Sequence, residues 1–197
     1  MIKIGITGGI GSGKSVVASL FTFRGVPVYL ADEESKRLTN HSPHIREGLI
    51  QLFGPAIYID ENLNKPLLAS HIFNDPDMRQ RVNQIIHPEV KRDFLAWVER
   101  QTTPLCAIEC AILFESGFNE LVDHSLMVYA PLELRINRAI RRDKSTKEAI
   151  KRRMESQMPD EEKRDRSDFV IHNDDRKALI PQVDAFISDL LSLSLRL

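Results

Sequence analysis

The sequence predicts an α/β protein: a three-layer sandwich around a five-stranded parallel sheet, interrupted by two helical insertions. Short apolar runs alternate with helical patterns along most of the 197 residues, which is typical of a doubly wound sheet. A glycine-rich stretch at residues 8–15 joins the first apolar run to the first helical pattern. The expected strands lie at residues 2–7, 26–30, 105–109, 125–129 and 169–171.

The glycine-rich stretch from Gly8 to Ser15 follows the pattern G-x-x-x-x-G-K-[ST] of a P-loop. Its glycines let backbone N–H groups turn toward an anion, and the helix that follows adds the positive end of its dipole. Lys14 can reach the β- and γ-phosphates, and the Ser15 hydroxyl can ligate Mg²⁺. A flexible glycine turn is the alternative, but the required strand and helix flank this one, so we expect ATP to bind. The expected nucleotide-binding residues are Gly9, Ile10, Gly11, Ser12, Gly13, Lys14, Ser15 and Val16.

Bulk composition narrows the class of protein. The formal net charge is −1 with 28% charged residues, which gives no indication of binding to nucleic acid or to a membrane surface. Cys106 and Cys110 are too few for a zinc site and are expected to be buried, reduced side chains. The N-terminal apolar run is too short for a signal peptide. We therefore expect a cytoplasmic protein, either a monomer or a small homo-oligomer.

The second expected strand runs into Ala31-Asp32. Ligands of an open parallel sheet bind beyond the carboxyl ends of its strands, so Asp32 is a candidate catalytic carboxylate beside the phosphates. Asp is also a good helix N-cap, and the two interpretations are compatible. Glu109 ends the third expected strand, either as a ligand of a metal or water or simply as the strand's last residue.

Residues 32–101 are mainly helical in pattern. Ser42 and Asp75 each precede a proline and are expected to start helices. His87-Pro88 interrupts the long pattern that follows and should kink it.

A basic amphipathic stretch follows the fourth expected strand. Arg138 and Arg142 are four residues apart and therefore share one helical face. The stretch is either a solvated face or a source of two guanidiniums for a transferring phosphoryl group. A P-loop core with two helical insertions is the layout of a small-molecule kinase, with one insertion for the acceptor and one closing over ATP. The expected division is a nucleotide-binding core of residues 1–31, 102–130 and 169–197, a helical acceptor domain of residues 32–101 and a lid of residues 131–168.

Several short motifs, in this order and spacing, resemble the dephospho-CoA kinase family over nearly the whole chain. They are Ile6 to Ser15, Ala31-Asp32, Ile86-His87-Pro88, Leu113-Phe114-Glu115, Gln157-Met158-Pro159, Lys163-Arg164 and Ser167 to Asn173. The resemblance implies transfer of a phosphoryl group from Mg·ATP to the ribose 3′-hydroxyl of dephospho-CoA, the last step of coenzyme A synthesis.

The resemblance also implies residue roles. Asp32 is the counterpart of the catalytic carboxylate and, like His87, belongs to the substrate-binding set, which also includes Leu113 and Glu115. Lys14, Arg138 and Arg142 complete the catalytic set, and Asn173 is expected to contact adenine. The chain departs from the family pattern at several positions. None of these departures removes a residue expected to bind phosphate, to bind the metal or to act as the base. These departures are Val16 for Thr, Glu109 for Asp, Ala111 for Pro, Arg135 for Gln, Ser167 for Ala and His172 for Asp.

Three other classes are weighed against this one. A regulatory GTPase should carry Asn-Lys-x-Asp, but Asn64-Lys65 is followed by Pro66-Leu67. A non-catalytic nucleotide-binding module would lack both Asp32 and the paired arginines. Another P-loop nucleoside or nucleotide kinase with a different acceptor remains the alternative.

Overall fold

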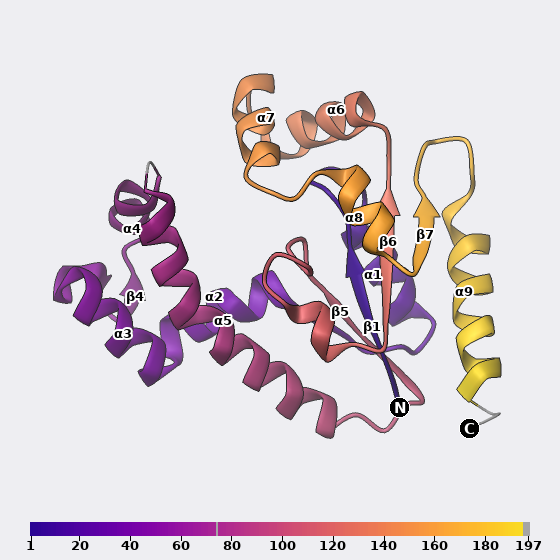
Figure 1. Ribbon diagram of the computed structural model, residues 1–197, viewed down its shortest axis with the longest axis horizontal. Helices are drawn as coiled ribbons and strands as arrows, with labels where there is room; N and C mark the ends of the chain where they lie inside the picture. Colours follow the sequence, from indigo (N-terminus) through magenta and orange to yellow (C-terminus); the bar gives the residue numbers. More distant parts are fainter. Residues whose placement is uncertain (74, 195–197) are drawn as a thin grey trace. The chain divides into compact units, whose positions relative to one another are not determined.

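The computed structural model describes residues 1–73 and 75–194 (Figure 1). The chain divides into two compact units. One contains Met1–Leu30 with Gln101–Leu197, and the other is the helical segment Ala31–Arg100. The lid segment predicted from the sequence, residues 131–168, groups with the first of these units.

The first unit is built on a five-stranded sheet in the order β2-β5-β1-β6-β7, with every pairing parallel. Its strands are β1 (Ile2–Thr7), β2 (Val28–Leu30), β5 (Leu105–Glu109), β6 (His124–Tyr129) and β7 (Phe169–His172). The predicted five-stranded parallel sheet is therefore confirmed. Because all strands are parallel, their carboxyl ends meet at one edge, where ligands of such sheets bind.

One face of the sheet is covered by α1 (Lys14–Phe23) and α9 (Leu179–Ser194), which pack on each other and on the strands. Ile4 and Ile6 of β1 point into this layer, where Phe21 and Phe186 approach with ring centroids 6.0 Å apart. Alternate side chains of a strand face opposite sides, so Gly5 faces the other layer, where it lies against Leu113. Apolar burial on both faces is what makes these strands nearly continuous hydrophobic runs.

Three helices follow the carboxyl end of β6: α6 (Leu132–Asp143), α7 (Lys147–Glu155) and α8 (Asp160–Arg166). Figure 1 shows α6 directly beyond the arrowhead of β6 and α8 returning along that strand. The basic stretch of the sequence is thus helical and begins at the ligand edge of the sheet. Among the described residues no helix is both long and apolar enough to cross a membrane.

The helical unit contains α2 (Ala31–His41), α3 (Pro43–Phe53), α4 (Lys65–Ile72) and α5 (Pro76–Glu99). Both predicted helix starts are confirmed. The Ser42 hydroxyl accepts from the Ile45 N–H, and the Asp75 carboxylate accepts from the Met78 N–H at 2.8 Å. Each cap residue satisfies one of the N–H groups that the first helical turn leaves unpaired.

α5 runs as one helix through Pro88, and the buried Val90 and Phe94 continue its packed face beyond the proline. The kink expected at His87-Pro88 stays a prediction. One feature of this unit differs from the sequence prediction. Between α3 and α4 the chain forms a short turn, η1 (Pro55–Ile57), and an antiparallel pair, β3 (Tyr58–Ile59) with β4 (Asn62–Leu63). The sequence pattern predicts no strands in this stretch, which lies within the mainly helical residues 32–101.

Candidate functional site

The loop between β1 and α1 has the backbone of an anion-binding turn. Positive φ angles occur at Gly8 (145°), Gly11 (79°) and Gly13 (98°), and the Ser12 N–H donates back to the Gly9 carbonyl. The Val17 N–H donates to the Gly13 carbonyl, so the helix begins as the loop ends. The loop N–H groups and the helix dipole together favour negative charge at this point.

Two of the loop glycines make room for α6. A Cβ on Gly9 would lie 1.9 Å from Nη1 of Arg135, and a Cβ on Gly11 would lie 2.2 Å from the Arg135 carbonyl oxygen. The second contact is with backbone, which cannot turn aside as a side chain can. The first turn of α6 therefore lies directly on the outer side of the P-loop.

Replacing Gly11 by alanine should lower the free energy of unfolding by about 2–4 kcal/mol, because it combines a positive φ with overpacking against α6. Gly25→Ala is the matched control: its φ is 78°, and nothing lies within 4 Å of a Cβ placed there. That variant isolates the conformational cost, about 1–2 kcal/mol. Urea unfolding of both variants tests this, and equal losses would contradict the close approach of α6.

Lys14, the first residue of α1, has a largely buried side chain whose Nζ lies 4.0 Å from Oε1 of Glu109. Glu109 ends β5, the strand that pairs with β1. The acid that the sequence placed at a strand end thus lies beside the lysine of the P-loop motif. Ser15 and Val16 follow on the exposed side of the first turn of α1.

Asn173, just after β7, is hydrogen-bonded to the P-loop near the start of α1. Its Nδ2 donates to the Ser12 carbonyl at 2.8 Å, and its backbone carbonyl accepts from Nη1 of Arg138 at 3.0 Å. Arg138 also pairs with Asp175. The amide predicted to contact adenine is therefore bonded to the P-loop, and Arg138 reaches the loop through it.

Arg142 lies one turn further along α6, where its side chain is 60% exposed and pairs with Asp143 at 2.7 Å. Asp143 also pairs with Arg153 of α7, and these hydrogen bonds lower the pKa of its carboxyl to about 2. To act on a phosphoryl group, Arg142 would have to exchange this partner for the phosphate.

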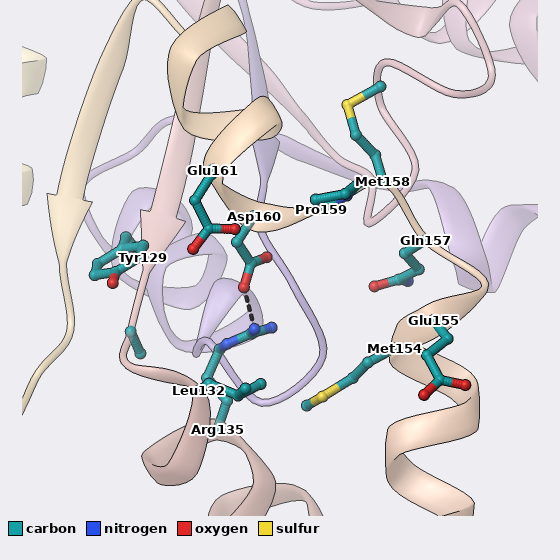
Figure 2. A pocket seen from close by; sticks show the side chains of 11 residues that line it. Tyr129, Leu132, Arg135, Met154, Glu155, Gln157, Met158, Pro159, Asp160 and Glu161 are labelled. Carbon is teal, nitrogen blue, oxygen red and sulfur yellow. Dashed lines mark ion pairs between the residues drawn. The ribbon is translucent and has the colours of Figure 1, made fainter.

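A buried ion pair that the sequence pattern does not indicate lies at the loop. The guanidinium of Arg135 pairs with the carboxylate of Asp160, the first residue of α8, and its Nη1 donates to the Ile10 carbonyl at 3.4 Å. Both residues line a cavity of about 390 Å³ between β6, α6 and the α7–α8 connection (Figure 2). Arg135 shares a helical face with Arg138, but a charged residue in a basic run is ordinarily exposed, so the pattern did not single it out.

Glu115 connects three of the family-like motifs. Its Oε1 accepts from the Met158 N–H at 2.9 Å and lies 2.9 Å from Nζ of the fully buried Lys163. That ammonium also donates to the Ala111 carbonyl at 2.6 Å. Leu113 is fully buried, with its side chain packed against Gly5. Neither Leu113 nor Glu115 is among the residues that line the cavity near Arg135, and their role in substrate binding stays a prediction.

Two predicted site residues lie in the helical unit. Asp32 is exposed in the first turn of α2, two residues after β2 ends at Leu30. Because α2 begins at Ala31, Asp32 is inside the helix, and the N-cap interpretation is wrong. His87 lies half-buried within α5, where burial, and then the charge of Lys91, lowers the pKa of its imidazole.

No cluster of three or more His, Cys, Asp or Glu side chains suited to a metal occurs in the described part of the chain. In nucleotide sites Mg²⁺ is usually held by one or two side chains together with phosphate oxygens and water. The exposed Ser15 hydroxyl beside the P-loop fits this requirement.

Comparison with known sequences gives a consistent result. The sequence model described as dephospho-CoA kinase matches residues 2–178. The chain is 51% identical to a dephospho-CoA kinase of Bacteroides fragilis over 190 residues, which cover 96% of this chain and 93% of the relative. It is 46% identical to that of Porphyromonas gingivalis, covering 93% and 91%.

Solved structures agree with the fold. The Thermus thermophilus protein TT1252 superposes with a TM-score of 0.83 at 34% identity, covering 97% of this chain and 96% of that one. A shikimate kinase of Acinetobacter baumannii, at 17% identity and a TM-score of 0.55 over 98% and 94% of the two chains, shares the fold alone. The sequence match over residues 2–178, which includes parts of both units, and the identity to these relatives show that the chain belongs to the dephospho-CoA kinase family.

Proposed function

We propose that this chain transfers the γ-phosphoryl group of ATP to the ribose 3′-hydroxyl of dephospho-CoA, giving coenzyme A and ADP. Family membership supports the reaction, and the observation that carries it is the P-loop conformation with Lys14 at the start of α1. Phosphoryl transfer asks the protein mainly for positioning and for positive charge. The loop N–H groups and Lys14 supply both at the β- and γ-phosphates.

The metal that such a reaction uses would be held by the Ser15 hydroxyl and by phosphate oxygens of the nucleotide. When bound, Mg²⁺ neutralises charge on the phosphates. Glu109 acts here by orienting Lys14, since the two side chains form an ion pair.

Asp32 is proposed to orient the acceptor hydroxyl and to take its proton. Support comes from chain position: β2 belongs to the parallel sheet, and Asp32 follows its carboxyl end by two residues. We assign acceptor binding to the helical unit, including His87, and a lid function to residues 131–168. In that lid Arg138 and Arg142 would offset charge on the transferring group.

The acceptor separates this proposal from the alternative of another nucleoside or nucleotide kinase. Purified protein with Mg·ATP should phosphorylate dephospho-CoA at a rate at least about 10³-fold above adenosine or AMP, because the site is expected to use the whole acceptor for orientation. Production of ADP, followed by a coupled assay, measures the rate, and mass spectrometry identifies the product.

Two further arms complete this experiment. Chelation of the metal by EDTA should stop turnover, and excess Mg²⁺ should restore it. Preferred phosphorylation of adenosine or AMP would refute the proposed acceptor while leaving the kinase assignment intact.

A further inference from the structure

The ion pair of Arg135 and Asp160 occupies an unusual place for two charges. Both side chains are about nine-tenths buried. Both lie close to Gly9: a Cβ placed on Gly9 would be 1.9 Å from the Arg135 Nη1 and 2.6 Å from the Asp160 Oδ1. Figure 2 shows the two groups meeting at one wall of the cavity, with Met154 and Gln157 pointing into the same space. A buried charge pair is at most a weak source of stability, so its position calls for another explanation.

The guanidinium is incompletely satisfied where it lies. Its Nη1 makes one long hydrogen bond, to the Ile10 carbonyl at 3.4 Å, and its Nε is buried with no hydrogen-bond partner among the described residues. Arginine carries five N–H donors and binds phosphate through two of them at a time. Arg135 thus has N–H groups that make no hydrogen bond with the described residues, and it lies at the edge of the loop proposed to bind phosphates.

Asp160 is surrounded by positive charge. Burial raises the pKa of its carboxyl, while the charges of Arg135, Lys163 and Lys14 oppose that rise. A carboxylate in this position repels an incoming anion and at the same time neutralises the nearest guanidinium.

We propose that Arg135 is a second phosphate-binding cation of this site and that Asp160 is the counter-charge that weakens its hold on an anion. The proposal rests on the proposed function, because it takes the anion to be the phosphates of a nucleotide held by residues 8–15. Together the two residues add no net charge to the site. Separately they act on nucleotide affinity in opposite directions.

This opposition distinguishes the proposal from simple packing. If the pair only fastened α6 and α8 to the P-loop, breaking it from either side would loosen the loop and weaken nucleotide binding. If the pair balances charge, removing the acid frees Arg135 and strengthens binding, and removing the cation leaves Asp160 uncompensated. Replacing both partners by neutral amides restores the balance.

The experiment measures the Kd of ADP by isothermal titration calorimetry, without metal and at low salt. Asp160→Asn should tighten binding about five- to tenfold, the effect of one partly buried charge near the phosphates. Arg135→Gln should weaken binding by a similar factor, and the double variant should return to within about twofold of the unaltered chain. Raising the salt concentration should reduce the differences in Kd between the variants, because salt screens the charge of the bound nucleotide.

The matched control is Asp165→Asn, which removes the same charge from the same helix. Its side chain is 72% exposed and pairs with Arg164, so we expect a change below about twofold. Thermal unfolding of every variant shows whether the fold is kept. Arg135→Lys, which retains the positive charge, should bind ADP more tightly than Arg135→Gln if the charge matters.

Weaker or unchanged ADP binding by Asp160→Asn would overturn the proposal and leave the pair as a packing contact. Two single variants that both lose affinity, with a double variant no better, would do the same. Failure of the unaltered chain to bind ADP would instead contradict the proposed function, and with it this inference.

Discussion

Replacing Lys14 by alanine should abolish turnover, lowering kcat/KM by about 10³-fold or more. In the proposed function the lysine places a positive charge at the β- and γ-phosphates, and its attraction for them grows as negative charge shifts during transfer. Such electrostatic groups carry the largest single catalytic effects. Its side chain is only 11% exposed and lies 4.0 Å from a Glu109 carboxylate oxygen. Its charge therefore acts in a partly dehydrated site, where it counts for more than in water.

Lys14→Met should show the same loss, because methionine keeps much of the length and apolar character but not the charge. Lys147→Ala is the control for a general loss of positive charge: this lysine is 44% exposed and pairs with Glu133. We expect its kcat/KM to stay within about twofold of the unaltered chain. Steady-state kinetics and thermal unfolding test all three variants, and near-normal turnover by either Lys14 variant would refute the P-loop assignment.

The sheet was predictable because its strands are short apolar runs with polar boundaries. The boundaries that failed have local causes. β2 begins at Val28 instead of Val26, because the Val26 N–H donates back to the Phe21 carbonyl and closes the end of α1. The β3–β4 hairpin turns at Asp60 and Glu61, which have positive φ angles of 47° and 69°. Glycine or asparagine normally marks such a turn, so this pair of acids gave no indication of one.

The site was predictable where one continuous segment makes it. Residues 8–15 contain their own turn, glycines and helix start, so the motif alone indicated the conformation of this loop. Contacts between distant segments were not predictable. Arg135 and Asp160 are 25 residues apart on different helices. The buried Lys163 of α8 pairs with Glu115, which comes much earlier in the chain. In the sequence each of these four residues looks like an ordinary charged side chain. Only the tertiary fold shows which partner it has.

Asp32→Asn should lower kcat about 10²–10⁴-fold while leaving the Kd of ATP nearly unchanged. A carboxylate that orients the acceptor hydroxyl and receives its proton acts mainly in the transition state, and effects of that size are typical of general-base catalysis. Asparagine has almost the same shape and can still accept a hydrogen bond, but it cannot take the proton. The change should therefore appear in kcat rather than in folding or in nucleotide binding.

Glu33→Gln is the matched control, because Glu33 is the next residue in the first turn of α2, is exposed like Asp32 and carries the same charge. Loss of the helix-dipole contribution is then common to both variants, typically 0.3–1 kcal/mol for an acid in the first turn. Any difference in kcat between the variants reports the specific role of Asp32. If Asp32→Asn instead lost ATP affinity and kept kcat, the carboxylate would belong to nucleotide or metal binding, because only an interaction made equally in the bound state and in the transition state changes affinity without changing the rate of transfer.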